Sequence, residues 1–114
     1  MTHAPKAYGY VRLRPDAGER ELLHIDRLLR RCADRHALRI VGILYEEGPG
    51  LSPDRLIRRL GRDGIRHVVV PSLRQITEHP PLRRHLARAI ILGAGARLYE
   101  ADLLTGAGHF TTGA

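Results

Sequence analysis

Aromatic residues, cysteine and lysine are scarce in this chain. The first two scarcities exclude an aromatic core and a framework of internal disulfides. There is no Trp, one Phe and four Tyr, so a core must come from Leu, Ile, Val and Ala, which a hydrophobic fraction of 43% can supply. The single cysteine, Cys32, excludes an internal disulfide framework. Its place on the apolar side of a predicted helix indicates a buried, inert thiol.

Long apolar runs are also missing. No segment approaches the roughly 20 residues of a membrane span, and Met1–Lys6 has no hydrophobic signal core. We therefore expect a cytoplasmic protein with no membrane partner. With 114 residues, the chain is long enough for one domain and short for two.

The charge is strongly positive. The formal net charge is +7, and only one of the 19 basic residues is a lysine, Lys6. High-GC coding explains the preference for arginine over lysine, but it does not explain the excess of basic over acidic residues. A surplus of arginine favours contact with a polyanion, most simply nucleic acid.

Apolar periodicity predicts alternating strands and helices. We predict a strand at 7–13, a helix at 19–36, a strand at 38–45, a helix capped by Ser52 and ended by Gly61 and Gly64, and a strand at 67–71. Residues 77–81 are expected to be irregular, and they precede a helix with Leu82, Leu86, Ala89 and Ile90 inward and a strand at 96–100.

This order, β-α-β-α-β-α-β, predicts an α/β fold: a three-layer sandwich with a mainly parallel four-stranded sheet and helices on both faces. We expect a flexible N-terminus at 1–6, the domain at 7–103 and a flexible tail at 104–114. Ligands of such sheets bind outside the C-terminal strand ends. Those ends are expected at Arg12–Arg14, Glu46–Ser52, Pro71–Arg74 and Glu100–Asp102.

Three segments at these ends resemble the N-terminal catalytic domain of the serine recombinases, the resolvase/invertase family. Tyr8-Gly-Tyr-Val-Arg-Leu-Arg14 is similar to that family's opening strand, typically Tyr-x-Arg-Val-Ser. The segment from Glu47 to Arg55 is similar to its Ser/Gly-rich loop, which ends in an arginine before a helix. Val68 to Glu78 is similar to its third strand and its Leu-Asp-Arg-Leu-x-Arg signature. The resemblance covers about residues 7 to 102 and implies a resolvase-like, flavodoxin-like fold.

The resemblance also implies a chemistry that this chain has lost. In that family a serine hydroxyl attacks a DNA phosphodiester while arginines stabilise the developing charge. Arg14 stands at the nucleophile's position, and a guanidinium has no lone pair available for attack. Arg74 stands at the family's aspartate position. Gln75 and Glu78 replace two arginines of the signature, whereas Arg12 and Arg55 match expected arginines. We therefore expect a pseudoenzyme without catalytic residues, and one that lacks the family's dimerisation helix and helix-turn-helix domain.

Other chemistries find little support in the sequence. Ser52 is expected to be a helix cap, and no predicted general base neighbours Ser72, the other serine. His67, His79 and His85 are scattered, so neither a metal site nor a cofactor is indicated. The segment 48–50, Gly-Pro-Gly, lacks the ending of a Walker loop. A nuclease or hydrolase of another kind stays as an alternative.

Two readings of the site stay open. Arg12, Arg14, Arg55 and Arg74 are expected to converge and hold a phosphate of a nucleic acid or nucleotide, which describes a regulatory DNA-binding module. Alternatively, acidic residues pair with these arginines, and the cluster is structural. The carboxylates in question are Glu46, Glu47, Glu78 and Asp102.

A different class of function is also compatible with the sequence. The resemblance implies a homo- or hetero-oligomerising protein-interaction module that pairs as a homodimer or with an active recombinase. Two arginine groups could serve either kind of partner, or they could be ordinary solvated helix faces. They are Arg58, Arg59, Arg62 and Arg66, and Arg83, Arg84 and Arg88.

Overall fold

The computed structural model describes residues 4–13, 15–47, 53–73, 77 and 79–101. The described strands form one parallel sheet in the order β2-β1-β3-β4. They are β1 (Lys6–Arg12), β2 (Arg39–Glu46), β3 (His67–Val70) and β4 (Arg97–Glu100). The strand order and the parallel pairing confirm the predicted α/β class.

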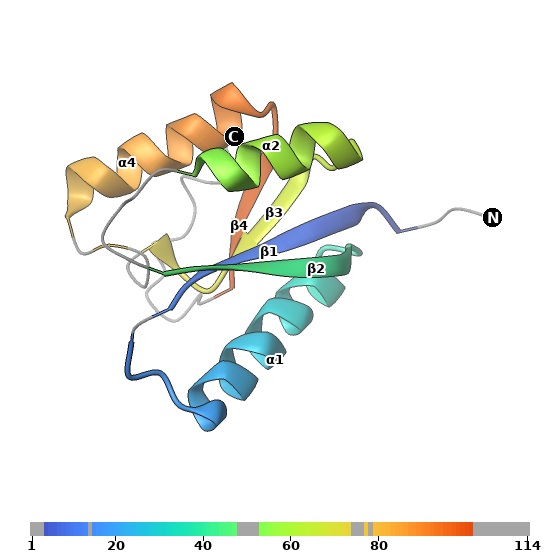
Figure 1. Cartoon of the computed structure of the whole chain (residues 1–114). Coiled ribbons are helices and arrows are strands. Elements are labelled where there is room, and N and C mark those ends of the chain that lie inside the picture. The colour runs from blue at the N-terminus through green and yellow to red at the C-terminus, as the bar shows by residue number, and fades with distance from the viewer. Residues whose placement is uncertain (1–3, 14, 48–52, 74–76, 78, 102–114) are drawn as a thin grey trace.

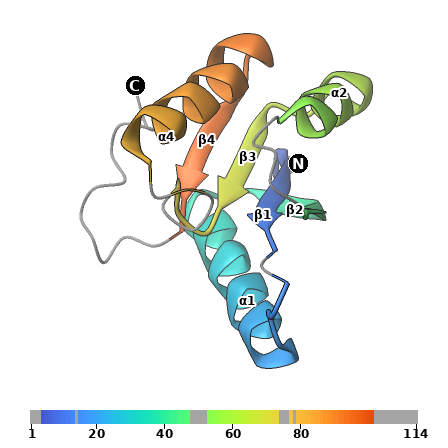
Figure 2. The same cartoon turned by 60° about the vertical axis from the view of Figure 1, so that its left-hand side comes forward.

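Helices cover both faces of the sheet, as predicted. Helix α1 (Glu19–Arg35) lies on one face, and α2 (Asp54–Asp63) and α4 (Pro80–Arg88) lie on the other, where α4 runs into a π-helical turn, η1 (Ala89–Gly93). Figures 1 and 2 show the three layers from two directions. No helix in the described part of the chain is long and apolar enough to span a membrane.

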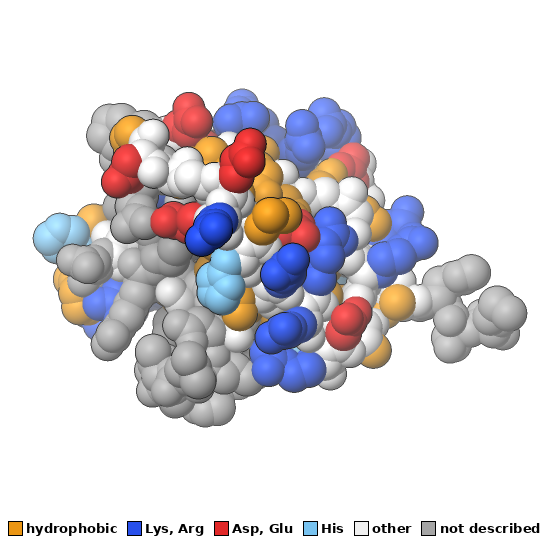
Figure 3. Space-filling view, turned by 90° about the horizontal axis from the view of Figure 1, so that it is seen from below, with side chains coloured by type: hydrophobic (Ala, Val, Ile, Leu, Met, Phe, Trp, Pro, Cys, Tyr) orange, Lys and Arg blue, Asp and Glu red, His pale blue; other side chains and the backbone are white. Residues whose placement is uncertain are grey.

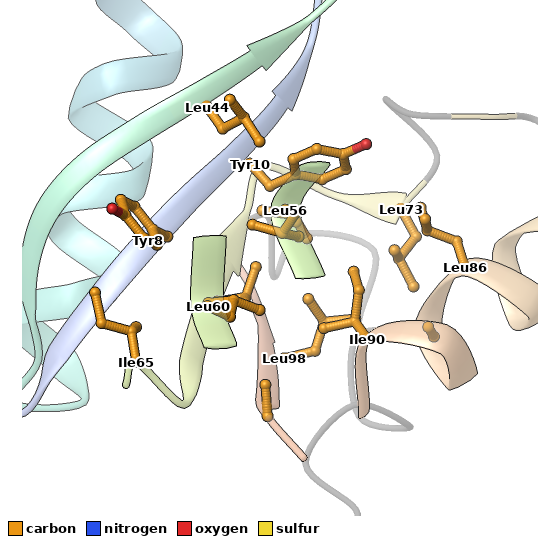
Figure 4. Packing of buried hydrophobic residues seen from close by; sticks show 14 residues of the cluster. Tyr8, Tyr10, Leu44, Leu56, Leu60, Ile65, Leu73, Leu86, Ile90 and Leu98 are labelled. Carbon is orange, nitrogen blue, oxygen red and sulfur yellow. The ribbon is translucent and has the colours of Figure 1, made fainter. Parts of the chain in front are cut away.

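Each face of the sheet has its own hydrophobic core. On the α1 face, Val11, Ile25, Leu29 and Cys32 are buried together. On the other face, β1 contributes Tyr8 and Tyr10, and the helices contribute leucines and an isoleucine (Figure 4). Because successive side chains of a strand point to opposite faces, neighbouring residues of β1 belong to different cores. The helix-facing residues of this second core are Leu56, Leu60, Leu86 and Ile90.

Glycine lets α1 approach the sheet closely. A Cβ at Gly9 of β1 would lie 2.9 Å from Leu29 Cδ1 and 3.0 Å from Ile43 Cγ1. Real Cβ atoms do not approach carbons so closely, so a larger residue at Gly9 would push α1 or β2 away. The close packing of the Leu29 side chain of α1 against the backbone of β1 therefore depends on this glycine.

Helix boundaries account for most of the differences from the sequence prediction. Of the two glycines predicted to end α2, Gly61 lies inside the helix, whereas Gly64, whose φ of 67° is left-handed, does end it. Residues 80 and 81 were predicted to be irregular, but α4 begins at Pro80, since proline is favoured in a first turn. Leu82 was predicted to face inward, yet it is 39% exposed. Residues beyond 101, including the predicted tail, lie outside the described part.

Candidate phosphate site at the strand ends

The C-terminal ends of β1 and β2 bring an arginine, a glutamate and a tyrosine together. Arg12 is the register partner of Glu46, and Tyr10 is the partner of Leu44. Tyr10 and Leu44 belong to the core beneath α2, and strand alternation places Arg12 and Glu46 on that same face. Arg55, in the first turn of α2, completes the group. We call these four residues, Tyr10, Arg12, Glu46 and Arg55, the strand mouth.

Glu46 holds the charge at the centre of the strand mouth. Its Oε2 lies 3.8 Å from Nη1 of Arg55, and its side chain is 13% exposed whereas that of Arg55 is 58% exposed. Its other oxygen, Oε1, is buried and accepts no hydrogen bond from the described residues. A buried carboxylate oxygen without a donor is costly, so Glu46 depends on nearby positive charge.

Tyr10 supplies the hydroxyl group of the strand mouth, and its surroundings favour the neutral phenol. Burial raises the pKa of Tyr10 to about 12, and the Glu46 carboxylate adds to the rise. The charges of Arg12 and Arg55 oppose it. The phenol is therefore protonated at neutral pH and is a poor nucleophile. Figure 4 shows its hydroxyl pointing away from Leu44 and Leu56.

The other half of the sheet edge is closed by hydrogen bonds. The backbone N–H of Leu73 donates to Oε1 of Glu100 at 2.8 Å, and Ala101 N donates to Val70 O at 2.8 Å. Glu100 thereby ties the segment after β3 to the end of β4. Ser72 lies in that segment and is half-buried.

The structure brings together two of the four arginines predicted for the site. Arg12 and Arg55 meet at the strand mouth, whereas Arg14 and Arg74 lie outside the described residues. The predicted carboxylate pairing is found for Glu46 with Arg55. Glu78 and Asp102 also lie outside the described part, and Glu47 is exposed.

Sequence reasoning missed two members of the site. Tyr10 belongs to the strand mouth because it precedes Arg12 by two residues and so shares its strand face, a signal that alternation alone provides. The role of Glu100 depends on a backbone N–H from a distant segment. The sequence pattern of β4 alone does not predict such a contact.

Histidine and cysteine do not form a metal site among the residues that the structure describes. His67 Nδ1 lies 2.9 Å from the hydroxyl of Tyr99, and burial lowers the pKa of His67, with Arg97 adding to the effect. Cys32 is buried, as predicted, and burial raises the pKa of its thiol. Both groups thus have structural surroundings rather than those of a reactive centre.

Solved structures with the same arrangement of strands and helices define the fold. The N-terminal catalytic domain of TP901-1 integrase superimposes with a TM-score of 0.63 and 13% identity, over 84% of this chain and 76% of that one. The C-terminal catalytic domain of ISC1926 TnpA, an IS607-like serine recombinase, gives a TM-score of 0.66 and 14% identity, over 89% and 72%. This chain has the serine recombinase catalytic-domain fold.

That fold confirms the resemblance found in the sequence. No protein-family model and no curated protein matches this sequence. At 13% and 14% identity, the two structures establish the fold of this chain and not its activity. The function has to be argued from the strand mouth itself.

Proposed function

We propose that this chain is a non-catalytic relative of the serine recombinases that binds a phosphate-bearing ligand, foremost DNA, and acts as a regulator. The observation that carries the proposal is the placing of two arginines beside Glu46: Arg12 is its register partner on β1, and Arg55 Nη1 lies 3.8 Å from its Oε2. Arginine is suited to phosphate because its planar fork of donors can hold two oxygens at once. By the sequence resemblance, Arg14 and Arg74 would add positive charge.

Two residues near the strand ends support the non-catalytic part of the proposal. By the sequence resemblance, Arg14 stands at the position of the family's attacking serine, and Tyr10 stays protonated because its pKa is about 12. Among the described residues, Ser72 is the serine near this edge of the sheet. A supercoiled-plasmid nicking assay, with and without a divalent metal, is expected to show no nicking. Reproducible nicking that Ser72→Ala abolishes would overturn this part.

Glu46 offers a way to separate phosphate binding from a purely structural cluster. A carboxylate at 3.8 Å from Arg55 competes with an incoming phosphate for the same guanidinium. If the arginines bind phosphate, Glu46→Gln removes a competing negative charge and should tighten binding. If the cluster is structural, Glu46→Gln should only lower stability, because it removes the partner of the arginines.

The test is a titration of mononucleotides and short DNA duplexes at low salt. We expect binding by the wild type, tighter binding by Glu46→Gln, and weaker binding by Arg12→Ala and Arg14→Ala. Thermal unfolding of each variant checks that it is folded. Absence of wild-type binding, or binding unchanged by these substitutions, would remove the phosphate site.

A second candidate function is an interaction module that pairs with itself or with an active recombinase. The observation that favours it lies on α4 and η1, where Leu92 is 70% exposed beside a surface depression of about 600 Å³. Arg84, His85 and Arg88 line the same depression. Light scattering with and without DNA should then show a dimer that Leu92→Ala weakens. A monomer under all conditions would dismiss this candidate.

A further inference from the structure

A groove on the outer surface of α2 is lined by arginines alone. Arg55, Arg58, Arg59 and Arg62 surround a surface depression of about 440 Å³. We call these four residues the α2 row. They are spaced three, four and seven residues from Arg55, which places them on one side of the helix. The sequence had suggested a face with Arg66 instead of Arg55. Arg66 follows Gly64, which ends the helix, so it does not belong to the row.

The α2 row carries more positive charge than its acidic neighbours balance. Asp63 accepts a hydrogen bond from the Tyr8 hydroxyl and another from Nε of Arg62 at 3.4 Å. The hydrogen bond from Tyr8 lowers the pKa of Asp63, and so do the hydrogen bond from Arg62 and the charges of Arg62 and Arg59. Arg58 forms no ion pair with any described residue, and it is exposed. Three carboxylates, Glu46 and Asp54 at one end and Asp63 at the other, therefore face four guanidinium groups.

The row runs along the sheet from the strand mouth. Arg55 is 3.8 Å from Glu46, at the C-terminal end of β2, whereas Arg62 shares Asp63 with Tyr8, at the other end of β1. Seven residues of α-helix span about 10 Å. One strand of a DNA duplex rises about 3.4 Å of axis per phosphate and winds around that axis, so a row of this length would face about two consecutive phosphates.

The chemistry of the row favours the backbone of a duplex over other anionic surfaces. Helix α2 has no aromatic residue on which unpaired bases could stack, which single-strand binders use. Its apolar side chains Leu56 and Leu60 are buried and Ile57 is half-buried, so the helix has no fully exposed apolar side chain to insert into a lipid surface. What is exposed is a line of guanidinium groups, each suited to a phosphate.

We propose that the α2 row is a second anion-binding surface, which holds the sugar-phosphate backbone of a nucleic-acid duplex and aligns it with the strand mouth. This inference rests on the proposed function only in sharing Arg55. The row predicts a sequence-independent contact, because guanidinium groups on phosphates do not read base edges.

The test compares two matched double substitutions. Arg58→Ala with Arg62→Ala removes two charges from the row, whereas Arg27→Ala with Arg31→Ala removes two charges at the same spacing from α1, on the opposite face of the sheet (Figure 1). Alanine keeps both helices intact because it is the best helix former. The readout is the dissociation constant of a fluorescent DNA duplex over a series of salt concentrations, for folded variants.

We expect the row variant to bind the duplex severalfold more weakly, with a salt dependence reduced by about two phosphate contacts, a change of roughly 1.8 in the slope of log affinity against log salt. The α1 variant should bind like the wild type. Equal behaviour of the two variants would overturn the row. So would tighter wild-type binding to a single strand, or to poly-glutamate, than to the duplex.

Mononucleotide binding separates this inference from the proposed function. A single phosphate at the strand mouth should still bind to the row variant and should be lost with Arg12→Ala. If the wild type binds mononucleotides but its duplex affinity is unchanged by substitution of Arg58 and Arg62, the α2 row is refuted as a binding surface and the phosphate site at the strand mouth is supported. If duplex affinity falls in the row variant but is unchanged by Arg12→Ala, the α2 row is supported and the phosphate site at the strand mouth is refuted.

Discussion

Helices α1 and α2 cover opposite faces of one sheet and are both rich in arginine, but their arginines have different surroundings. On α1, Asp26 pairs with Arg30 at 3.1 Å, and Glu19 and Glu21 lie in the first turn. Figure 3 shows acidic and basic side chains mixed on that face. On α2, the acidic residues stand only at the two ends of the helix, Asp54 and Asp63. The two helices therefore differ less in their number of arginines than in the position of the carboxylates between those arginines.

The hydrophobic cores on the two faces should contribute equally to the free energy of unfolding. Substitutions in these cores have the largest expected effect. Leu29 of α1 is fully buried and Leu60 of α2 is 1% exposed, each within its own core. We expect Leu29→Ala and Leu60→Ala each to lower the free energy of unfolding by about 2–5 kcal/mol, because a cavity is left in a packed core. Chemical denaturation measures both.

A control for this comparison is Leu23→Ala on the outer side of α1. Leu23 is 55% exposed, so its removal should change the free energy of unfolding by less than about 0.5 kcal/mol. If only one of the two buried leucines proved costly, the two cores would not support the fold equally.

Substitutions just after the two helices should change the free energy of unfolding by smaller amounts and with opposite signs. After α1 the chain turns through Ala37 with φ of 55°, and after α2 through Gly64 with φ of 67°. A side chain in this left-handed region costs about 1 kcal/mol, and glycine avoids that cost. We expect Ala37→Gly to raise the free energy of unfolding by up to about 1 kcal/mol and Gly64→Ala to lower it by a similar amount. Urea unfolding of both variants would contradict this account if the two shifts had the same sign.

The smallest predicted effect concerns alkaline stability. The pKa of Tyr10 rises from an ordinary 10.0 to about 12 in the folded state. The folded protein thus holds this proton more tightly than the unfolded chain. The resulting contribution to stability is complete below pH 10 and is lost as the pH rises through about 12.

Tyr10→Phe should remove that loss. Between pH 10 and 12 the free energy of unfolding should fall less steeply in this variant than in the wild type. An ultraviolet titration of tyrosinate in the folded protein should also lose its latest step. Identical alkaline profiles for both proteins would show that Tyr10 is not held neutral by its surroundings.

Much of the fold was accessible from the sequence because it depends on local patterns. The apolar stripe with Ile25, Leu29 and Cys32 predicted α1 within one residue of its end, and the alternation of strands and helices predicted the parallel sheet. The start of α4 at Pro80 was missed because the same residue favours both loops and first helical turns.

The site was only partly accessible. Arg12 and Arg55 could be placed together because the ends of parallel strands meet at one edge. The neutral state of Tyr10 and the unpartnered oxygen of Glu46 depend on burial by distant residues, which no local pattern specifies. The members of the α2 row could not be predicted without the end of the helix at Gly64. That boundary shows that Arg55, and not Arg66, belongs to the row.

One measurement compares both faces of the molecule at once: nuclear magnetic resonance of isotope-labelled wild-type protein during titration with a short DNA duplex at low salt. The account predicts that amide shifts concentrate at Arg12, Glu46 and along α2, while α1 is unaffected. Shifts concentrated on α1, or spectra unchanged by saturating duplex, would contradict it.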